Sequence, residues 1–209
     1  AFLPDGTLVV AEPGSSNLDE INLIEKGGNH GWSAREGTYV HRTSGGLLGS
    51  IATLPDDDAG NGYVYPAVQF GHSGPRGAAT TGHALGGGYV VSNGSALDGR
   101  YFYGELATSG DLYFATVEAL EATVRKGAPG ALTQAAMLRA RILFDHDGDP
   151  ATPPQPRTSM IDVVNDSPAY DGSGRGDIRF GQGPDGTLYL MSKRNGMIYR
   201  IANSRPDRK

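Results

Sequence analysis

Acidic residues gather at two places in this sequence where their oxygens could bind a cation. Asp19 and Glu20 stand ahead of an apolar run at residues 21–24, and Asp145, Asp147 and Asp149 occupy alternate positions later in the chain. Calcium takes about six to eight oxygen ligands, and the second pattern is similar to the start of a calcium-binding loop. The glutamate expected at the twelfth position of an EF-hand is absent, because Pro156 stands there. A solvated acidic turn is the alternative interpretation.

Composition excludes several other kinds of chemistry. The 209 residues contain no cysteine, which removes disulfides, thiolate nucleophiles and Cys-ligated metal sites. The five histidines stand apart from one another, and no catalytic residue is predicted among them. The net charge of -5 argues against nucleic acid as a partner. Because no stretch approaches eighteen apolar residues, we expect no membrane span.

Short β-strands are the elements expected to position these residues. The chain has 32 glycines and 13 prolines between short apolar runs, as in an all-β protein with many tight turns. The sequence Pro-Asp-Gly-Thr-Leu occurs at residues 4–8 and again at 184–188, each time as a turn signal before a strand. Eleven strands are predicted, at residues 7–11, 20–24, 67–70, 88–92, 100–106, 111–116, 140–144, 160–164, 177–180, 187–191 and 197–201.

The remaining segments are expected to be one helix and two long loops. Residues 116–125 place apolar side chains at helical spacing, and residues 131–138 could add a further turn. Residues 43–65 and 145–158 are predicted as irregular loops. Eleven strands, at about four antiparallel strands per blade, predict about three blades of a β-propeller in one partial domain, residues 1–209. Three blades do not close a ring, so we expect the missing blades or a partner subunit to complete it.

The segment from Asp19 to Trp32 resembles a signature of the glucose/sorbosone dehydrogenase family. In that signature Asp-Glu, an apolar run and Gly-x-Asn-Tyr-Gly-Trp follow one another, and this chain has His30 in place of the tyrosine. Residues 87–105 and 183–201 are similar to two further blade segments of the family. Its members are β-propeller enzymes that use pyrroloquinoline quinone (PQQ) and calcium. The resemblance therefore implies the C-terminal half of such a propeller.

Five site residues follow from the resemblance. Glu20 matches a glutamate whose carboxylate binds calcium, and His30 stands where a main-chain carbonyl supplies another ligand. Gly14 and Ser15 fall in the segment whose backbone carbonyls hold the calcium associated with the cofactor. PQQ carries three carboxylates, and Arg175 is the residue expected to meet one of them.

The same comparison shows where this chain departs from the family. An Arg-x-Arg-Asp motif is replaced by Arg175-Gly176-Asp177, and residues 108–113 lack the lysine of a late blade. The resemblance implies PQQ- and calcium-dependent oxidation of a sugar hydroxyl or aldehyde, with a cytochrome or quinone as electron acceptor, in a periplasmic or secreted protein. The missing cations leave open a non-catalytic propeller that serves as a binding or assembly subunit of a larger extracellular complex. A propeller hydrolase with calcium in its channel is a third alternative.

Overall fold

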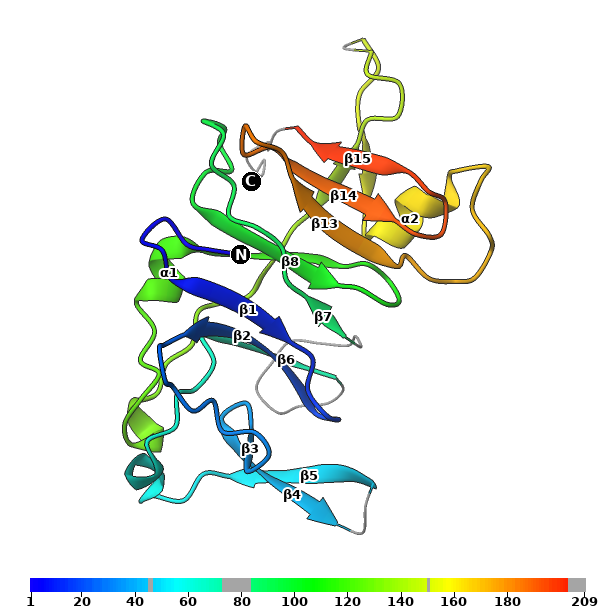
Figure 1. The fold of residues 1–209 in the computed structure, drawn as a ribbon. Helices are drawn as coiled ribbons and strands as arrows, with labels where there is room; N and C mark the ends of the chain where they lie inside the picture. Colours follow the sequence, from blue (N-terminus) through cyan, green and yellow to red (C-terminus); the bar gives the residue numbers. More distant parts are fainter. Residues whose placement is uncertain (45–46, 73–83, 150, 203–209) are drawn as a thin grey trace.

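Antiparallel sheets follow one another through the chain in this computed structural model, which describes residues 1–44, 47–72, 84–149 and 151–202 (Figure 1). The first has the order β1-β2-β6, the second β10-β9-β8-β7 and the third β13-β14-β15. Their bounds are β1 (Leu8–Glu12), β2 (Leu18–Ile24), β6 (Val68–Gly71), β7 (Leu85–Gly86), β8 (Arg100–Glu105), β9 (Leu112–Thr116), β10 (Leu138–Arg139), β13 (Ile178–Gln182), β14 (Leu188–Ser192) and β15 (Ile198–Ile201).

This succession of sheets confirms the all-β, partial-propeller prediction. The sheets have three, four and three strands, so only the second reaches the four strands expected of a blade. Across the described ranges they do not close into a ring. A fourth sheet of two strands, β11 (Ile142–Phe144) and β12 (Gln155–Arg157), lies on either side of the acidic segment at 145–149.

One sheet was not predicted. The strands β3 (Arg35–Glu36), β4 (Tyr39–Ser44) and β5 (Leu47–Thr53) form it, and the 3-10 turn η1 (Asp58–Asn61) follows, largely within residues predicted as a loop. Figure 1 shows these strands beside the first blade, below β2 and β6. None of the apolar side chains of this sheet whose burial the structure describes is buried. The hydrophobic pattern of these residues in the sequence is correspondingly weak.

Two predicted strands are not strands in the structure. Residues 160–164 are not a strand but the start of helix α2 (Met160–Asn165), with Met160, Val163 and Val164 buried on one face. Asp162 caps this helix by accepting the N–H of Ser159 at 3.1 Å. Residues 88–92 are not a strand either; they contain only an isolated bridge, from Val90 to β8.

The predicted helix at 116–125 is shorter than expected. Helix α1 runs over Val117–Glu121, with the side chain of Thr116 accepting the N–H of Ala119 at 3.1 Å. The further turn expected within 131–138 is absent, since these residues follow a 3-10 turn, η2 (Pro129–Ala131), and lead into β10. No helix in the described part of the chain has the length and apolar character needed to cross a membrane.

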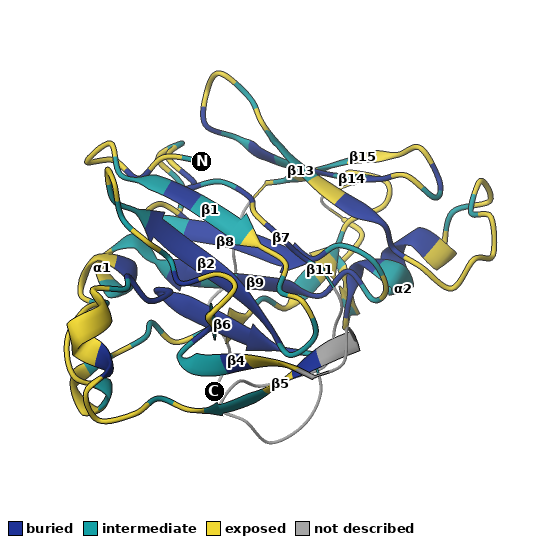
Figure 2. Cartoon of the chain, turned by 60° about the horizontal axis from the view of Figure 1, so that its bottom comes forward, coloured by how far each residue is buried: buried dark blue, intermediate teal, exposed yellow. Residues whose placement is uncertain are grey.

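The core lies between neighbouring blades. Ile21 and Phe70 of the first blade pack in one cluster with Tyr101 and Tyr103 of the second, all four fully buried. A second cluster joins the second blade to the third and to α2. Figure 2 shows β2 and β6 among the most buried strands. Six of the seven residues of β2 are buried, so this strand carries its polar side chains into the interior.

Candidate functional site

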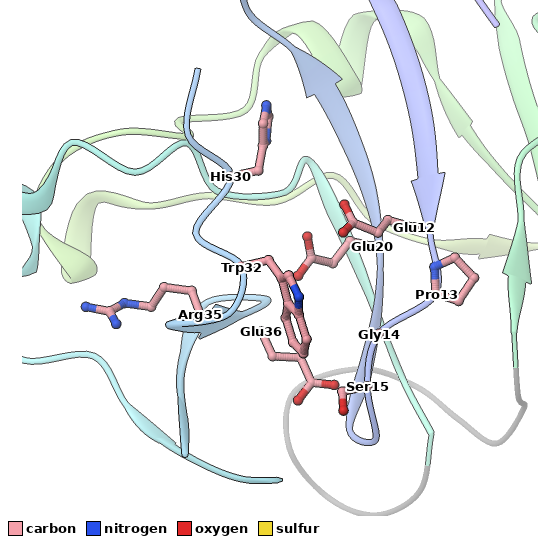
Figure 3. A pocket seen from close by; sticks show the side chains of 9 residues that line it. All are labelled: Glu12, Pro13, Gly14, Ser15, Glu20, His30, Trp32, Arg35 and Glu36. Carbon is pink, nitrogen blue, oxygen red and sulfur yellow. The ribbon is translucent and has the colours of Figure 1, made fainter. Parts of the chain in front are cut away.

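A pocket of about 300 Å³ opens where β1, β2 and β3 meet (Figure 3). Its walls come from the end of β1, the β1–β2 turn, β2, the segment after β2, and β3. The lining residues are Glu12, Pro13, Gly14, Ser15, Glu20, His30, Trp32, Arg35 and Glu36. Four of the five residues proposed from the sequence therefore lie together here: Gly14, Ser15, Glu20 and His30.

Glu20 is a buried carboxylate of this pocket, with 8% of its surface exposed. Its Oε1 accepts the N–H of Gly37 at 2.5 Å, and its Oε2 accepts the Nδ2 of Asn22 at 2.8 Å. Glu12 lies directly opposite Glu20 in the β1–β2 pairing. Burial raises the pKa of Glu20, and the negative charges of Glu12 and Glu36 raise it further. A carboxylate in such surroundings favours a bound cation.

Glu36 holds the β1–β2 turn in place. Its Oε1 accepts the backbone N–H groups of Ser16, Asn17 and Leu18 at 3.0, 2.8 and 3.2 Å. Asn17 also donates its side-chain amide to Oε2 of Glu36 and to the carbonyl of Gly49, each at 2.8 Å. Burial alone would raise the pKa of Glu36, but these hydrogen bonds keep it below its usual value. The turn is therefore fixed by an ionised carboxylate.

Asp19 fixes the other side of the same turn. It is fully buried, and its Oδ1 accepts the N–H of Gly14 at 2.8 Å. The same oxygen lies 2.5 Å from Nε2 of His72, while Oδ2 accepts the N–H of Leu85 at 2.6 Å. Asp19 thus ties the turn to the second blade.

His30 and Trp32 form the outer wall. Both ring nitrogens of His30 are buried and have no hydrogen-bond partner within the described ranges. Burial lowers the pKa of His30, so its imidazole is neutral at neutral pH. Trp32 is 57% exposed, and its ring centre lies 5.0 Å from that of His41. Figure 3 shows the indole of Trp32 in front of the carboxylates.

The charge of the pocket is negative. Arg35 is the one cationic side chain among its described lining residues, and it forms an ion pair with buried Asp58. Its guanidinium also lies over the ring of Tyr63, with Cζ 4.9 Å from the ring centre. Figure 3 shows the Arg35 side chain turned away from Glu20. Three glutamates therefore face the pocket without a cation of their own.

The structure places Arg175 apart from this pocket. Its Nε donates to the carbonyl of Ala107 at 3.0 Å, and its NH2 lies 3.1 Å from Asp177. Asp177 also pairs with Arg194. Burial alone would raise the pKa of Asp177, but the hydrogen bonds and charges of Arg175 and Arg194 hold it below its usual value. Arg175 is therefore already paired in the third blade.

The acidic segment at 145–149 matches the alternative interpretation, a solvated turn. Its aspartates are exposed, and each accepts a nearby backbone N–H: Gly148 for Asp145 and Asp149 for Asp147, at 2.8 and 2.9 Å. In the parts of the chain that the structure describes, no three Asp, Glu or His side chains gather closely enough to hold a metal ion. A metal site here must therefore combine carboxylates with amide or backbone oxygens.

The pocket around Glu20 suits calcium on that basis. It offers a buried carboxylate, a second carboxylate across the strand pair and the backbone of a rigid turn, all oxygen donors. It does not suit PQQ by itself. A quinone with three carboxylates would meet Glu12, Glu20 and Glu36, while Arg35 is held by Asp58. The described residues thus fit the metal and not the quinone.

Sequence reasoning missed three residues of this site. Glu36 and Asn22 drew no attention because neither belongs to a recognisable metal motif, although Asn22 stands two residues after Glu20, on the same face of the strand. Glu12 belongs to no such motif either, and its pairing with Glu20 follows only from the register of the hairpin.

Comparison with known proteins finds a family match that includes the residues of this pocket. A family model described as Glucose / Sorbosone dehydrogenase matches residues 1–128. Over 32 residues, 15% of this chain, the identity to quinoprotein glucose dehydrogenase B of Acinetobacter calcoaceticus is 59%, covering 7% of that protein. Over 202 residues, 95% of this chain, the identity to HIPL1 protein of Arabidopsis thaliana is 25%, covering 24% of that protein. The chain thus spans a small part of the length of either relative.

Proposed function

Because this chain belongs to the glucose/sorbosone dehydrogenase family, we propose that it is part of a calcium- and PQQ-dependent dehydrogenase that oxidises a sugar hydroxyl or aldehyde. The observation that carries the proposal is the acidic pocket built by residues 12–36, which lies inside the range matched by the family model. Electrons would pass to a cytochrome or quinone acceptor. We also propose, from the family alone, that the protein is periplasmic or secreted.

The proposed roles follow the contacts of the pocket. Glu20 would bind calcium through its carboxylate, together with the main-chain carbonyl of His30. Gly14 and Ser15 would present backbone carbonyls to a calcium beside the cofactor, and the turn that carries them is held by Asp19 and Glu36. Buried, fixed oxygens of this kind bind calcium well because little ordering is left to occur on binding.

PQQ would supply the redox chemistry, but the described residues provide no unpaired cation to hold it at this pocket. Arg175 would meet a cofactor carboxylate only after giving up its contact with Asp177. The groups that bind the quinone would therefore come in large part from the rest of the protein.

The experiment is reconstitution of the purified full-length protein with PQQ and Ca²⁺, followed by dye reduction with a panel of aldoses. We expect reduction that requires sugar, PQQ and Ca²⁺ together, and a Glu20→Gln variant that needs far more Ca²⁺ for the same rate. Glu121→Gln removes an exposed carboxylate on α1 and serves as the control. Absence of sugar-dependent reduction under all these conditions would contradict the proposal.

A non-catalytic binding or assembly subunit is the second candidate. The pairing of Arg35 with Asp58 and of Arg175 with Asp177 favours it, because both guanidiniums are engaged inside the protein. Titration of PQQ into the calcium-loaded protein separates the candidates. Saturable binding at micromolar PQQ supports the dehydrogenase, whereas no binding up to millimolar PQQ supports the subunit.

A further inference from the structure

Asn22 occupies the point between the two carboxylates that face each other across β1 and β2. Its Nδ2 donates to Oε2 of Glu20 at 2.8 Å and lies 3.3 Å from Oε2 of Glu12. The two glutamates are cross-strand partners, and Figure 3 shows their carboxylates turned to the same side. The amide group therefore stands where like charges would otherwise meet.

The oxygen of the same amide group, Oδ1, makes no hydrogen bond to the described residues. Asn22 is fully buried. A buried oxygen without a donor is costly, because it has lost its contacts with water and gained none in exchange. Such an atom is uncommon in a strand that is otherwise fully packed and paired.

We propose that Asn22 is a calcium ligand together with Glu12 and Glu20. A rotation of the terminal amide exchanges its oxygen and nitrogen. The rotation breaks the two contacts of Nδ2 with the carboxylates, which bonds to the ion would replace, whereas Oδ1 has no hydrogen bond to lose among the described residues. The rotated oxygen then faces the gap between the carboxylates. Two oxygens that share a calcium ion at about 2.3–2.6 Å from it lie roughly 3 Å from each other. The amide group stands 2.8 Å from Oε2 of Glu20 and 3.3 Å from Oε2 of Glu12, so the three side chains already have the separation of neighbouring ligands.

The inference rests on the proposed function, since it assumes that Glu20 binds calcium. It adds two side-chain ligands and a conformational step. Without the ion, the amide nitrogen stabilises the two carboxylates; with the ion, the amide oxygen joins them. All three side chains belong to one hairpin, so the ion would also lock β1 against β2.

The test uses Trp32, the only tryptophan of the chain, which lines the same pocket. Tb³⁺, a calcium surrogate, should show luminescence sensitised by Trp32, and added Ca²⁺ should displace it. We expect Asn22→Leu to weaken Ca²⁺ binding by about tenfold or more, and Asn22→Asp to bind at least as well as the parent. Glu12→Gln should also weaken binding, while Glu121→Gln should leave it unchanged. Calorimetric titration with Ca²⁺ checks the same affinities.

Two outcomes would overturn the inference, and they are distinguishable. If the parent binds Ca²⁺ and Asn22→Leu binds it equally or more tightly, the amide only competes with the ion, and the proposed function survives. If the parent binds no Ca²⁺ at millimolar concentration, the calcium proposal fails with it. Should Asn22→Leu fail to fold, Asn22→Ser keeps a small polar group and serves in its place.

Discussion

Asp19 and Glu20 follow each other on β2, and their side chains therefore lie on opposite faces of the first blade. Glu20 faces the pocket, where Glu12 and Asn22 contact it. Asp19 faces the second blade, where it contacts His72 and the N–H of Leu85. One acidic pair in the sequence thus serves two purposes, a candidate ligand on one face and a structural anchor on the other.

His72 should make the stability of the protein depend on pH. Its contact with Asp19 raises the pKa of His72 above its ordinary value of 6.5, and the charge of Glu36 adds to this, although burial opposes it. Because the folded state binds this proton more tightly, the contribution is fully present below about pH 6.5 and is lost as the pH rises through the folded pKa. We expect the free energy of unfolding to fall over that range.

The measurement is urea denaturation between about pH 6 and pH 9, comparing the parent with His72→Gln. The difference in unfolding free energy between the parent and the variant reports on His72 alone. The pKa of His30 is lowered, so its contribution to stability changes with pH in the opposite direction and at lower pH. His146→Gln, at an exposed histidine, should keep the pH dependence of the parent. Equal slopes for the parent and His72→Gln would contradict this prediction.

At the scale of elements, the β1–β2 turn is packed too tightly for a side chain at Gly14. A Cβ there would lie 1.7 Å from the carbonyl oxygen of Leu18 and 2.8 Å from Oε1 of Glu36. Gly14→Ala should therefore displace the turn and cost about 1–3 kcal/mol in the free energy of unfolding. Gly60→Ala, where a Cβ would meet nothing within 4 Å, should change it by less than about 0.5 kcal/mol. Urea denaturation of both variants checks this, and equal effects would show that the turn adapts.

The elements also show what the sequence could predict. Strands with regular turns and buried apolar residues, such as β1, β2, β8 and β14, were found close to their bounds. Residues 160–164 were predicted as a strand, whereas the hydrogen bond between Ser159 and Asp162 and the burial of one helical face favour the helix α2. The β3–β5 sheet was missed because its first strand is held by polar contacts, such as Arg35 with Asp58, which leave no hydrophobic pattern in the sequence.

The candidate site was predictable in part for a similar reason. Gly14, Ser15, Glu20 and His30 lie near one another along the chain, so a family motif could bring them together. Glu36 and His72 reach the site through strand pairing and through the arrangement of blades, which a linear pattern does not encode. Arg175, inferred from a distant motif, pairs with Asp177 in the third blade.

At the scale of the whole molecule, the open arrangement of blades leaves apolar edges uncovered. In the described part of the chain β15 is an outer strand of its sheet, and Ile198 on it is 64% exposed, with Met197 beside it 48% exposed. At the other end of the described chain, Phe2 is 66% exposed. Unpaired strands with exposed apolar side chains associate readily with another chain. The 209-residue chain should therefore self-associate when it is studied alone.

Replacing Ile198 with lysine should reduce this association without unfolding the protein. The charge would oppose edge-to-edge pairing, and because the side chain is exposed the free energy of unfolding should change by less than about 0.5 kcal/mol. Sedimentation velocity over a range of concentrations should show Ile198→Lys shifted toward the monomer. Val124→Lys introduces the same charge at an exposed apolar residue outside any strand, and it should associate like the parent. If both variants dissociate equally, net charge and not the β15 edge controls the association.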